Sequence, residues 1–537
     1  MAGEKRKAEE NKFISGVLVL TLSAIIVKII GLVYKIPMLR LLGSEGMGYF
    51  NSAYEIYALF CTVATTGLPV AMSVMISSLN DERGDERVFR ISMRLFFCLG
   101  AVGCAIMIAF ARPFAAFLGN AQAAYCIAAI SPTVFFICLA SAYRGYFQGK
   151  GKMLPTALSQ IIEALCKLIL GLLLALVALN SGFSTEIVAA FAVMGLTLGV
   201  ATSLLYLSVA KRMTRTNGLP FAPQSGEKGI AKRLLKIAIP VTLSSAVVSV
   251  TRVLDMSMIL RRLQDAGYSG EDAFAAYGNY TTLAIPLFSL APTLVSSVAL
   301  PLVPSLSGAV AQNDTSEQMR IAERALKLTA LISAPASLGL ALFSRPVLEL
   351  IFSGEDAAIA AATPSLAILG IAVIASCIIT VENAMLQAYG MAHVPLISMG
   401  IGTLVKITVA WMLLGNERFG LVGAPIGTLI CDAVICSINF YFIGKRLPSL
   451  KIISRVLLRP FLAAAISVVL SRVTYNAICL RFGESRVITL VSIALSAVLY
   501  LLLVLLLGAI DKEDLASLPI IGRSQKAKIE NNNTYIN

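Results

Sequence analysis

Ten ionisable side chains lie well inside long apolar segments of the chain. An ionised side chain that faces lipid at mid-depth costs about 2.5–3.5 kcal/mol, so ten of them would cost about 25–35 kcal/mol. That sum exceeds the roughly 5–15 kcal/mol by which a protein domain is stable. Most of these side chains are therefore expected to face other helices or a water-filled cavity. They are Lys28, Lys35, Glu55, Glu163, Lys167, Arg252, Asp255, Glu382, Lys406 and Asp432.

Lys28 and Lys35 form the clearest chemical pattern, because seven residues make two helical turns and place both ammonium groups on one face. With Arg40 beyond them and Arg252 on a later segment, such a face could donate charge-assisted hydrogen bonds to an anionic ligand. The alternative is that both lysines extend to the lipid headgroups or pair with a buried acid. The spacing alone leaves both interpretations open.

Acids and bases also stand close together along single segments. Glu163 and Lys167 are four residues apart, and neutralisation of each by the other within one helix is the simpler interpretation. Arg252 and Asp255 are three residues apart, and here mutual pairing and a role in binding stand about even.

The second apolar segment presents Asn51, Tyr54 and Glu55 on one face, where they could contact the same ligand. We therefore count all three among the cavity residues. Asp432 adds a further acid within a span, and we group it with Asp255 as a candidate for ion or charge coupling.

Composition identifies the kind of protein that positions these residues. The chain is 57% hydrophobic and 14% charged, with a mean hydropathy of +0.82. Soluble domains are about 25% charged, so we expect an all-α polytopic membrane protein. The first apolar run, Phe13 to Leu42, is too long for the core of a signal peptide and is interpreted as a retained first helix.

No motif indicates catalysis, a metal or a cofactor. The ten cysteines are scattered without a C-x-x-C pattern and are interpreted as core residues, and His393 stands without a metal partner. The segment 143–152, YRGYFQGKGK, alternates aromatic and basic residues, which is typical of a membrane interface rather than of a nucleic-acid site. We therefore expect no metal, no cofactor and no nucleic-acid partner.

Fourteen apolar segments are long enough to cross a bilayer. Lys and Arg concentrate at the two termini and in the even-numbered loops, so the positive-inside rule predicts that both termini are cytoplasmic. The net charge of +14 follows from this topology. The predicted spans are 13–39, 50–79, 92–111, 122–147, 155–179, 185–210, 232–260, 274–304, 321–344, 356–390, 394–414, 419–443, 455–475 and 487–509.

The two halves of the chain resemble each other. Five matches recur in order at nearly one offset: Asn80-Asp81 with Asn313-Asp314, Gln148 with Gln387, Pro155 with Pro395, Lys167 with Lys406, and Lys211-Arg212 with Lys445-Arg446. An even number of spans, six in each copy, makes the repeats parallel and predicts a central binding cavity at mid-depth between two lobes. The predicted boundaries are a cytoplasmic N-terminus 1–12, an N-lobe 13–210, a linker 211–231, a C-lobe 232–446, two further spans within 447–510 and a cytoplasmic tail 511–537.

Four stretches resemble a known family: GLVYKIPMLRLLGSEGMGYFNSAYEIY (31–57), GLPVAMSVMISS (67–78), YRGYFQGKGKMLPTALSQIIEALCK (143–167) and YGNYTTLAIPLF (277–288). They are similar to the stage V sporulation protein B branch of polysaccharide flippases. That branch belongs with the MurJ-type lipid II flippases in the multidrug/oligosaccharidyl-lipid/polysaccharide (MOP) superfamily. The resemblance covers nearly the whole chain and implies fourteen helices around a central cavity.

The resemblance assigns roles on the first span residue by residue. MurJ-type flippases have an arginine where Lys28 stands, which implies a cationic role there, and Arg40 also matches an arginine. A further cavity arginine of that family aligns with Tyr34, and the adjacent Lys35 could supply its charge.

Elsewhere the chain departs from the family pattern. A cavity arginine is missing near Cys61 and another within 279–281, where Arg252 could compensate. Asp255 matches a cation-binding aspartate, but its expected partners on the eleventh span are replaced and Lys406 stands there. We hypothesise that the Lys406 ammonium takes the place of a sodium ion beside Asp255.

The resemblance implies a flippase that carries an undecaprenyl-diphosphate-linked sugar from the inner to the outer leaflet of a bacterial cytoplasmic membrane. The partners would be this lipid-linked sugar diphosphate and the phospholipid bilayer, and the oligomeric state stays open. One alternative is a cation-coupled multidrug exporter of the same superfamily, in which the acids would dominate the cavity. A membrane-embedded sugar transferase would need an acidic pair in a long odd-numbered loop, and these loops are short.

Overall fold

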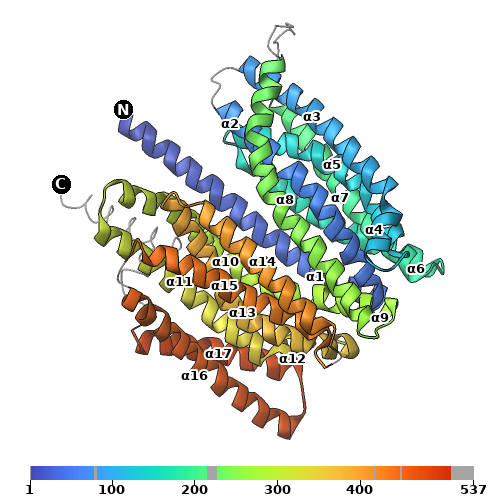
Figure 1. Ribbon diagram of the computed structural model, residues 1–537, viewed down its shortest axis with the longest axis vertical. Coiled ribbons are helices and arrows are strands. Elements are labelled where there is room, and N and C mark those ends of the chain that lie inside the picture. The colour runs from blue at the N-terminus through green and yellow to red at the C-terminus, as the bar shows by residue number, and fades with distance from the viewer. Residues whose placement is uncertain (1, 78–81, 215–226, 417, 448–449, 509–537) are drawn as a thin grey trace. The chain divides into compact units, whose positions relative to one another are not determined.

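The computed structural model describes residues 2–77, 82–214, 227–416, 418–447 and 450–508 (Figure 1). These described residues form helices and their connections and include no strand. Contacts divide the chain into two compact units. The first consists of Met1–Thr282 and Trp411–Gly423, and the second of Leu283–Ala410 and Ala424–Asn537.

The helices follow one another along the chain with short connections. Up to the π-helix, the elements are α1 (Ala2–Thr65), α2 (Gly67–Ser77), α3 (Glu82–Ala109), α4 (Ala111–Phe117), α5 (Ala123–Gly149), α6 (Met153–Asn180), α7 (Thr185–Met213), α8 (Glu227–Asp265), α9 (Gly270–Asn279) and the π-helix η1 (Tyr280–Ala284). The remaining elements are α10 (Ile285–Ala311), α11 (Thr315–Leu342), α12 (Ser344–Ile351), α13 (Asp356–Ala388), α14 (His393–Leu414), the 3-10 turn η2 (Gly420–Val422), α15 (Gly423–Gly444), α16 (Leu450–Phe482) and α17 (Arg486–Leu506).

The predicted fold class, an all-α polytopic membrane protein, is confirmed. Twelve helices of the described residues are long and apolar enough to cross a membrane. One of them, Leu22–Ile76, has 55 residues and covers the first two predicted spans. The helix α8 covers the predicted span 232–260, and the other eleven helices match the remaining predicted spans one to one.

The helix α1 consists of two helices joined at Gly43. Gly43 has φ 66° and ψ −179°, a conformation that residues with a Cβ atom rarely adopt. The ring centroids of Tyr34 and Phe50 lie only 6.0 Å apart, whereas sixteen residues of straight helix would separate them by about 24 Å. The chain therefore reverses at Gly43, and both halves of α1 contribute to one region of the first unit.

In the first unit, α5, α6 and α7 pack together, with α3 against α5 and α1 against α6. Figure 1 shows α3, α5 and α7 side by side. A Cβ atom on Gly195 of α7 would lie 2.2 Å from the Cα atom of Gly171 on α6. The two glycines therefore allow a close approach of these helix backbones, as is common between membrane helices.

In the second unit, α13 packs against α10 and α11 around Val295, Leu326 and Val373. The last two helices, α16 and α17, pack against each other and also contact α11 and α12. The Tyr500 hydroxyl of α17 donates a hydrogen bond to the Leu331 carbonyl of α11 at 2.9 Å. The two C-terminal spans therefore belong to the packing of the second unit.

One of the repeat matches has a local structural reason. Asp314 caps α11 by accepting a hydrogen bond from the Glu317 backbone N–H at 3.0 Å. This bond and the Ser316 hydroxyl lower the pKa of Asp314. The matching pair Asn80-Asp81 lies outside the described residues.

The predicted boundaries between the domains stay predictions. The contacts group α8 and α9 with the first unit, although the sequence assigns them to the C-lobe. Residues 215–226 of the predicted linker and 509–537 of the predicted last segments lie outside the described residues.

Candidate functional site

The first unit brings five of the ionisable side chains from the apolar segments together. Glu55 lies within electrostatic range of Lys35, Arg252 and Asp255, and Lys35 is also within range of Lys167. These side chains come from both halves of α1, from α6 and from α8. We call Lys35, Glu55, Lys167, Arg252 and Asp255 the charged cluster. Its three bases and two acids combine residues that the sequence separates by up to 220 positions.

Lys35 is half-buried and anchored to the π-helix η1. Its ammonium donates a hydrogen bond to the Thr281 carbonyl at 2.6 Å. A π-helix shifts backbone hydrogen bonds to an i→i+5 pattern, and such elements often mark functional sites. Lys35 of α1 therefore places its ammonium at η1.

Asn51 and Glu55, one helical turn apart, have different environments. Asn51 is buried and donates a hydrogen bond from its amide to the Thr282 hydroxyl at 2.8 Å. The Oε2 atom of Glu55 is buried and has no hydrogen-bond partner among the described residues. Asn51 therefore helps to hold η1, whereas Glu55 keeps an acceptor available within the charged cluster.

Lys167 is surrounded by three aromatic rings. Its Nζ atom lies 5.0 Å from the ring centroid of Tyr34, 5.3 Å from that of Tyr54 and 5.8 Å from that of Phe50. Aromatic faces attract a cation but leave its N–H groups able to donate hydrogen bonds. Tyr54 is 38% exposed, so this part of the cluster is accessible from outside.

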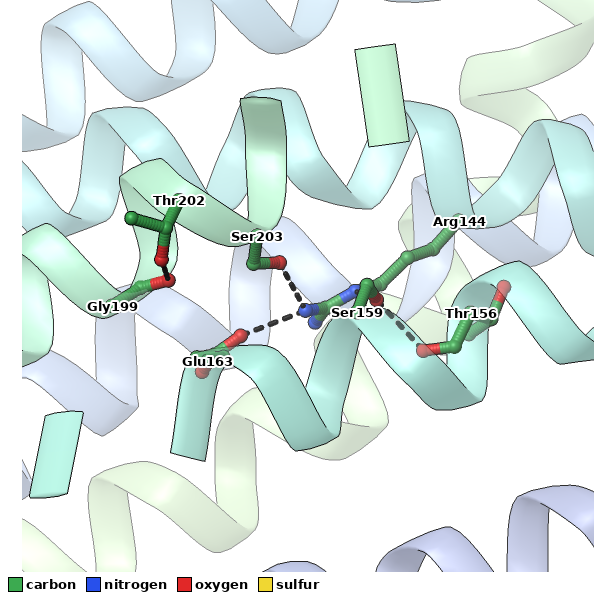
Figure 2. A network of polar contacts seen from close by, with 7 residues as sticks. All are labelled: Arg144, Thr156, Ser159, Glu163, Gly199, Thr202 and Ser203. Carbon is green, nitrogen blue, oxygen red and sulfur yellow. Dashed lines mark hydrogen bonds and ion pairs between the residues drawn. The ribbon is translucent and has the colours of Figure 1, made fainter. Parts of the chain in front are cut away.

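Glu163 is neutralised by a base that the helix spacing does not indicate. Figure 2 shows the Arg144 guanidinium of α5 between Glu163 and Ser159 of α6 and Ser203 of α7. Arg144 forms an ion pair with Glu163 at 2.7 Å and hydrogen bonds with both serines at 3.1 Å. The expected neutralisation of Glu163 and Lys167 within α6 is therefore replaced by an interhelical ion pair, although Lys167 stays within electrostatic range of Glu163.

Lys28 and Arg40 lie on α1 outside the charged cluster, and Arg252 and Asp255 are its members from α8. Lys28 and Arg40 are exposed, and Lys28 stands about 10 Å along α1 from Lys35. Arg252 is exposed and within electrostatic range of Tyr54, as well as of Glu55. Asp255 is half-buried, and Tyr277 of α9 lies within its electrostatic range.

Lys406 and Asp432 belong to the second unit, where they lie within electrostatic range of each other. Asp432 also accepts a hydrogen bond from the Ser376 hydroxyl. Asp255 belongs to the first unit, so the proposed contact between Lys406 and Asp255 stays a prediction.

Sequence reasoning missed Arg144 and the aromatic surroundings of Lys167. Arg144 stands near the end of a predicted span. A base is expected there from the positive-inside rule, so it was not a candidate for a buried ion pair. The aromatic residues at 34, 50 and 54 come together only because of the reversal at Gly43. Among the described residues, no group of three His, Cys, Asp or Glu side chains could hold a metal ion.

The fold defines a class of protein, an all-α protein with many membrane-spanning helices. The fold is similar to that of the lipid II flippase MurJ in an inward closed conformation, with a TM-score of 0.69 and 15% identity over 90% of this chain and 98% of that chain. It is also similar to an inward-facing multidrug resistance MATE family transporter, with a TM-score of 0.60 and 18% identity over 79% of this chain and 99% of that chain.

Sequence comparisons identify the family within this class. Residues 13–310 match the family described as polysaccharide biosynthesis protein, and the chain belongs to that family. Residues 240–412 also match the MatE family. The chain is 26% identical to stage V sporulation protein B of Bacillus subtilis (strain 168), over 95% of this chain and 98% of that protein. It is 24% identical to the lipid II flippase MurJ of the same organism, over 74% of this chain and 77% of that protein.

The predicted resemblance to stage V sporulation protein B and to the lipid II flippase MurJ is confirmed. Together with the long apolar helices, these matches indicate a multi-pass membrane protein.

Proposed function

We propose that the protein moves an undecaprenyl-diphosphate-linked sugar, of the lipid II or polysaccharide precursor type, from the inner to the outer leaflet of the bacterial cytoplasmic membrane. The observation that carries this proposal is the gathering of Lys35, Lys167 and Arg252 in one region of the first unit. The name of the relative MurJ, a lipid II flippase, supports the substrate class.

The chemistry of a diphosphate requires such a site. An unpaired charge is very costly to transfer into hydrocarbon, so the headgroup needs replacement partners throughout its passage. The ammonium groups of Lys35 and Lys167 and the Arg252 guanidinium could donate charge-assisted hydrogen bonds to the phosphate oxygens. The lipid tail would stay in the bilayer while access to the site alternates between the two faces of the membrane.

Membrane potential could drive this export. Moving a negative charge out of an inside-negative cell is favourable by about 2.3 kcal/mol per charge per 100 mV. We expect that collapsing the potential at constant pH and sodium slows transport, and an unchanged rate would contradict this part of the proposal. The proposal keeps the topology predicted from the sequence, with both termini on the cytoplasmic side of the membrane.

A second candidate function is cation-coupled export of small cationic compounds. It is favoured by the buried Glu55 oxygen without a hydrogen-bond partner among the described residues and by the similarity of fold to multidrug transporters. In that case Glu55 and Asp255 would bind the substrate or the coupling ion, and neutralising Lys35 would leave transport intact.

Reconstitution in vesicles distinguishes the two candidates. A lipid-linked sugar diphosphate is placed in one leaflet, and its appearance in the other is followed for the wild type, Lys35→Gln and Glu55→Gln. If the protein is a lipid flippase, Lys35→Gln should reduce the transport rate more than Glu55→Gln does. An excess of a cationic drug should then not compete with the lipid-linked sugar. Competition by the drug, together with normal activity of Lys35→Gln, would overturn the proposal.

A further inference from the structure

A mainly apolar groove with a volume of about 420 Å³ lies on the first unit between α3, α5 and α7. These three helices lie side by side in the upper part of Figure 1. The lining residues are Phe89 and Met93 of α3, Leu139 and Tyr143 of α5, and Ala201, Leu204, Leu205 and Ser208 of α7.

One end of the groove lies toward the ends of these three membrane-spanning helices. Phe89 stands near the start of α3, whereas Tyr143 and Ser208 stand near the ends of α5 and α7. The Lys211 ammonium lies 3.5 Å from the centroid of the Phe89 ring. From Ser208 the groove extends along α7 to Ala201, about 10 Å toward the middle of the span.

The outer wall of the groove faces away from the packed centre of the unit. Leu205 is 65% exposed, whereas Ser203 and Leu207 on the same helix are buried. In a membrane, such an apolar surface contacts lipid, and a groove of this shape can hold an acyl chain.

The polar end of the groove carries the positively charged side chain of Arg212. Glu86 forms an ion pair with Lys211 at 2.8 Å, and Asp85 forms one with Lys150 at 2.6 Å, so each of these two acids is already paired with a lysine. Arg212 is exposed and lies within electrostatic range of Tyr143. An exposed guanidinium at this level suits a phosphate oxygen.

We propose that this groove binds one anionic phospholipid, with an acyl chain between α3, α5 and α7 and the headgroup phosphate beside Arg212. Lipid tails are as apolar as the leucine side chains that line the groove. The bound acyl chain therefore fixes the position of the lipid but adds little preference for one lipid over another. The preference for an anionic headgroup comes from the basic end, and each base near the surface contributes about fivefold in affinity. The site is separate from the charged cluster and does not depend on the transported substrate.

A photoreactive lipid tests this site in the full-length protein. Phosphatidylglycerol and phosphatidylcholine with the same diazirine-labelled acyl chain are added to the purified protein, and the crosslinked peptides are mapped by mass spectrometry. We expect phosphatidylglycerol to label peptides of α3, α5 and α7 around the groove several-fold more than phosphatidylcholine does. Equal labelling by the two lipids, or labelling spread evenly over all lipid-facing helices, would overturn the proposal.

The repeat provides a matched control for the headgroup contact. Lys211-Arg212 in the last turn of α7 corresponds to Lys445-Arg446 directly after α15. We expect Arg212→Ala to reduce labelling of the groove by phosphatidylglycerol about fivefold, and Arg446→Ala to leave it unchanged. Because both residues are exposed, both variants should fold, which gel filtration checks. Equal losses in the two variants would show a general charge effect and contradict a site at Arg212.

Discussion

The two repeats hold corresponding three-helix junctions with different chemistry. In the first unit, the Arg144 guanidinium joins α5 to α6 and α7 through an ion pair with Glu163 and two serine hydroxyls (Figure 2). An offset of 239 residues relates Arg144 to Asn383 and Ser159 to Ser398. In the second unit these positions are joined by neutral groups, because Asn439 contacts Ser398 at 2.8 Å and Asn383 at 3.1 Å.

The same offset relates Lys167 to Lys406, and their surroundings also differ. Lys167 faces three aromatic rings, since Arg144 already neutralises the acid of its own helix. Lys406 lies within electrostatic range of Asp432. The comparison teaches that neutral amides suffice to join three such helices, and that the ion pair in the first unit leaves Lys167 available to a ligand.

The largest expected effect concerns the junction of the first unit. Arg144→Ala leaves the half-buried Glu163 carboxylate without its base, which should destabilise the protein by up to about 3–5 kcal/mol. Asn383→Ala at the corresponding place removes a neutral hydrogen bond and should cost about 1–2 kcal/mol. Thermal unfolding in detergent measures both.

A double variant separates loss of charge balance from loss of packing. Arg144→Met with Glu163→Met removes both charges and keeps apolar volume, so it should recover most of the stability. If the double variant were as unstable as Arg144→Ala, the ion pair would not be the reason for the loss.

The next effect is the change in transport rate when either of the two corresponding lysines, Lys167 or Lys406, is replaced. A hydrogen bond to a charged group contributes about 1.5–3 kcal/mol, so Lys167→Gln should slow transport of the lipid-linked substrate about 10- to 150-fold. Lys406→Gln, measured in the same vesicles, should have a much smaller effect because Asp432 is within its range. Equal losses would remove the distinction between the two units.

A smaller effect is expected from the hypothesis that Lys406 replaces a sodium ion. Transport by the wild type should not respond to sodium, whereas Lys406→Ala should gain a response, because a cation could then bind beside Asp255. Transport rates with sodium or choline as the only added cation test this. An equally strong sodium effect in both proteins would refute the hypothesis.

The smallest effect concerns the cap of α11 in the second unit. The pKa of Asp314 is lowered in the folded protein, so its charge stabilises the fold above the pKa of an unfolded aspartate, about 3.9, and this contribution is lost as the pH falls below that value. Asp314→Asn keeps a capping side chain but has no such pH dependence. The difference in Tm between the two proteins should therefore shrink from pH 7 to pH 3, and a constant difference would contradict this.

Much of the fold could be predicted from the sequence because long apolar segments are strong signals. The spans and the membrane class follow from hydropathy and segment length. The cost of burying charge predicts that the ionisable side chains inside the spans lie near one another. It does not predict that Lys35, Glu55 and Arg252 are the ones that do. The Arg144–Glu163 pair and the π-helix held by Lys35 depend on contacts between distant helices, which local spacing does not encode.

The most direct test of the central claim measures binding rather than transport. The claim is that the first unit holds a cationic site for the phosphates of a lipid-linked sugar. Two lipids with the same chain and sugar, one with a diphosphate and one without phosphate, are titrated against the wild type and Lys35→Gln/Lys167→Gln. The account predicts that the wild type binds the diphosphate lipid at least tenfold more tightly and that the double variant loses this preference. Equal affinity of the wild type for both lipids would contradict it.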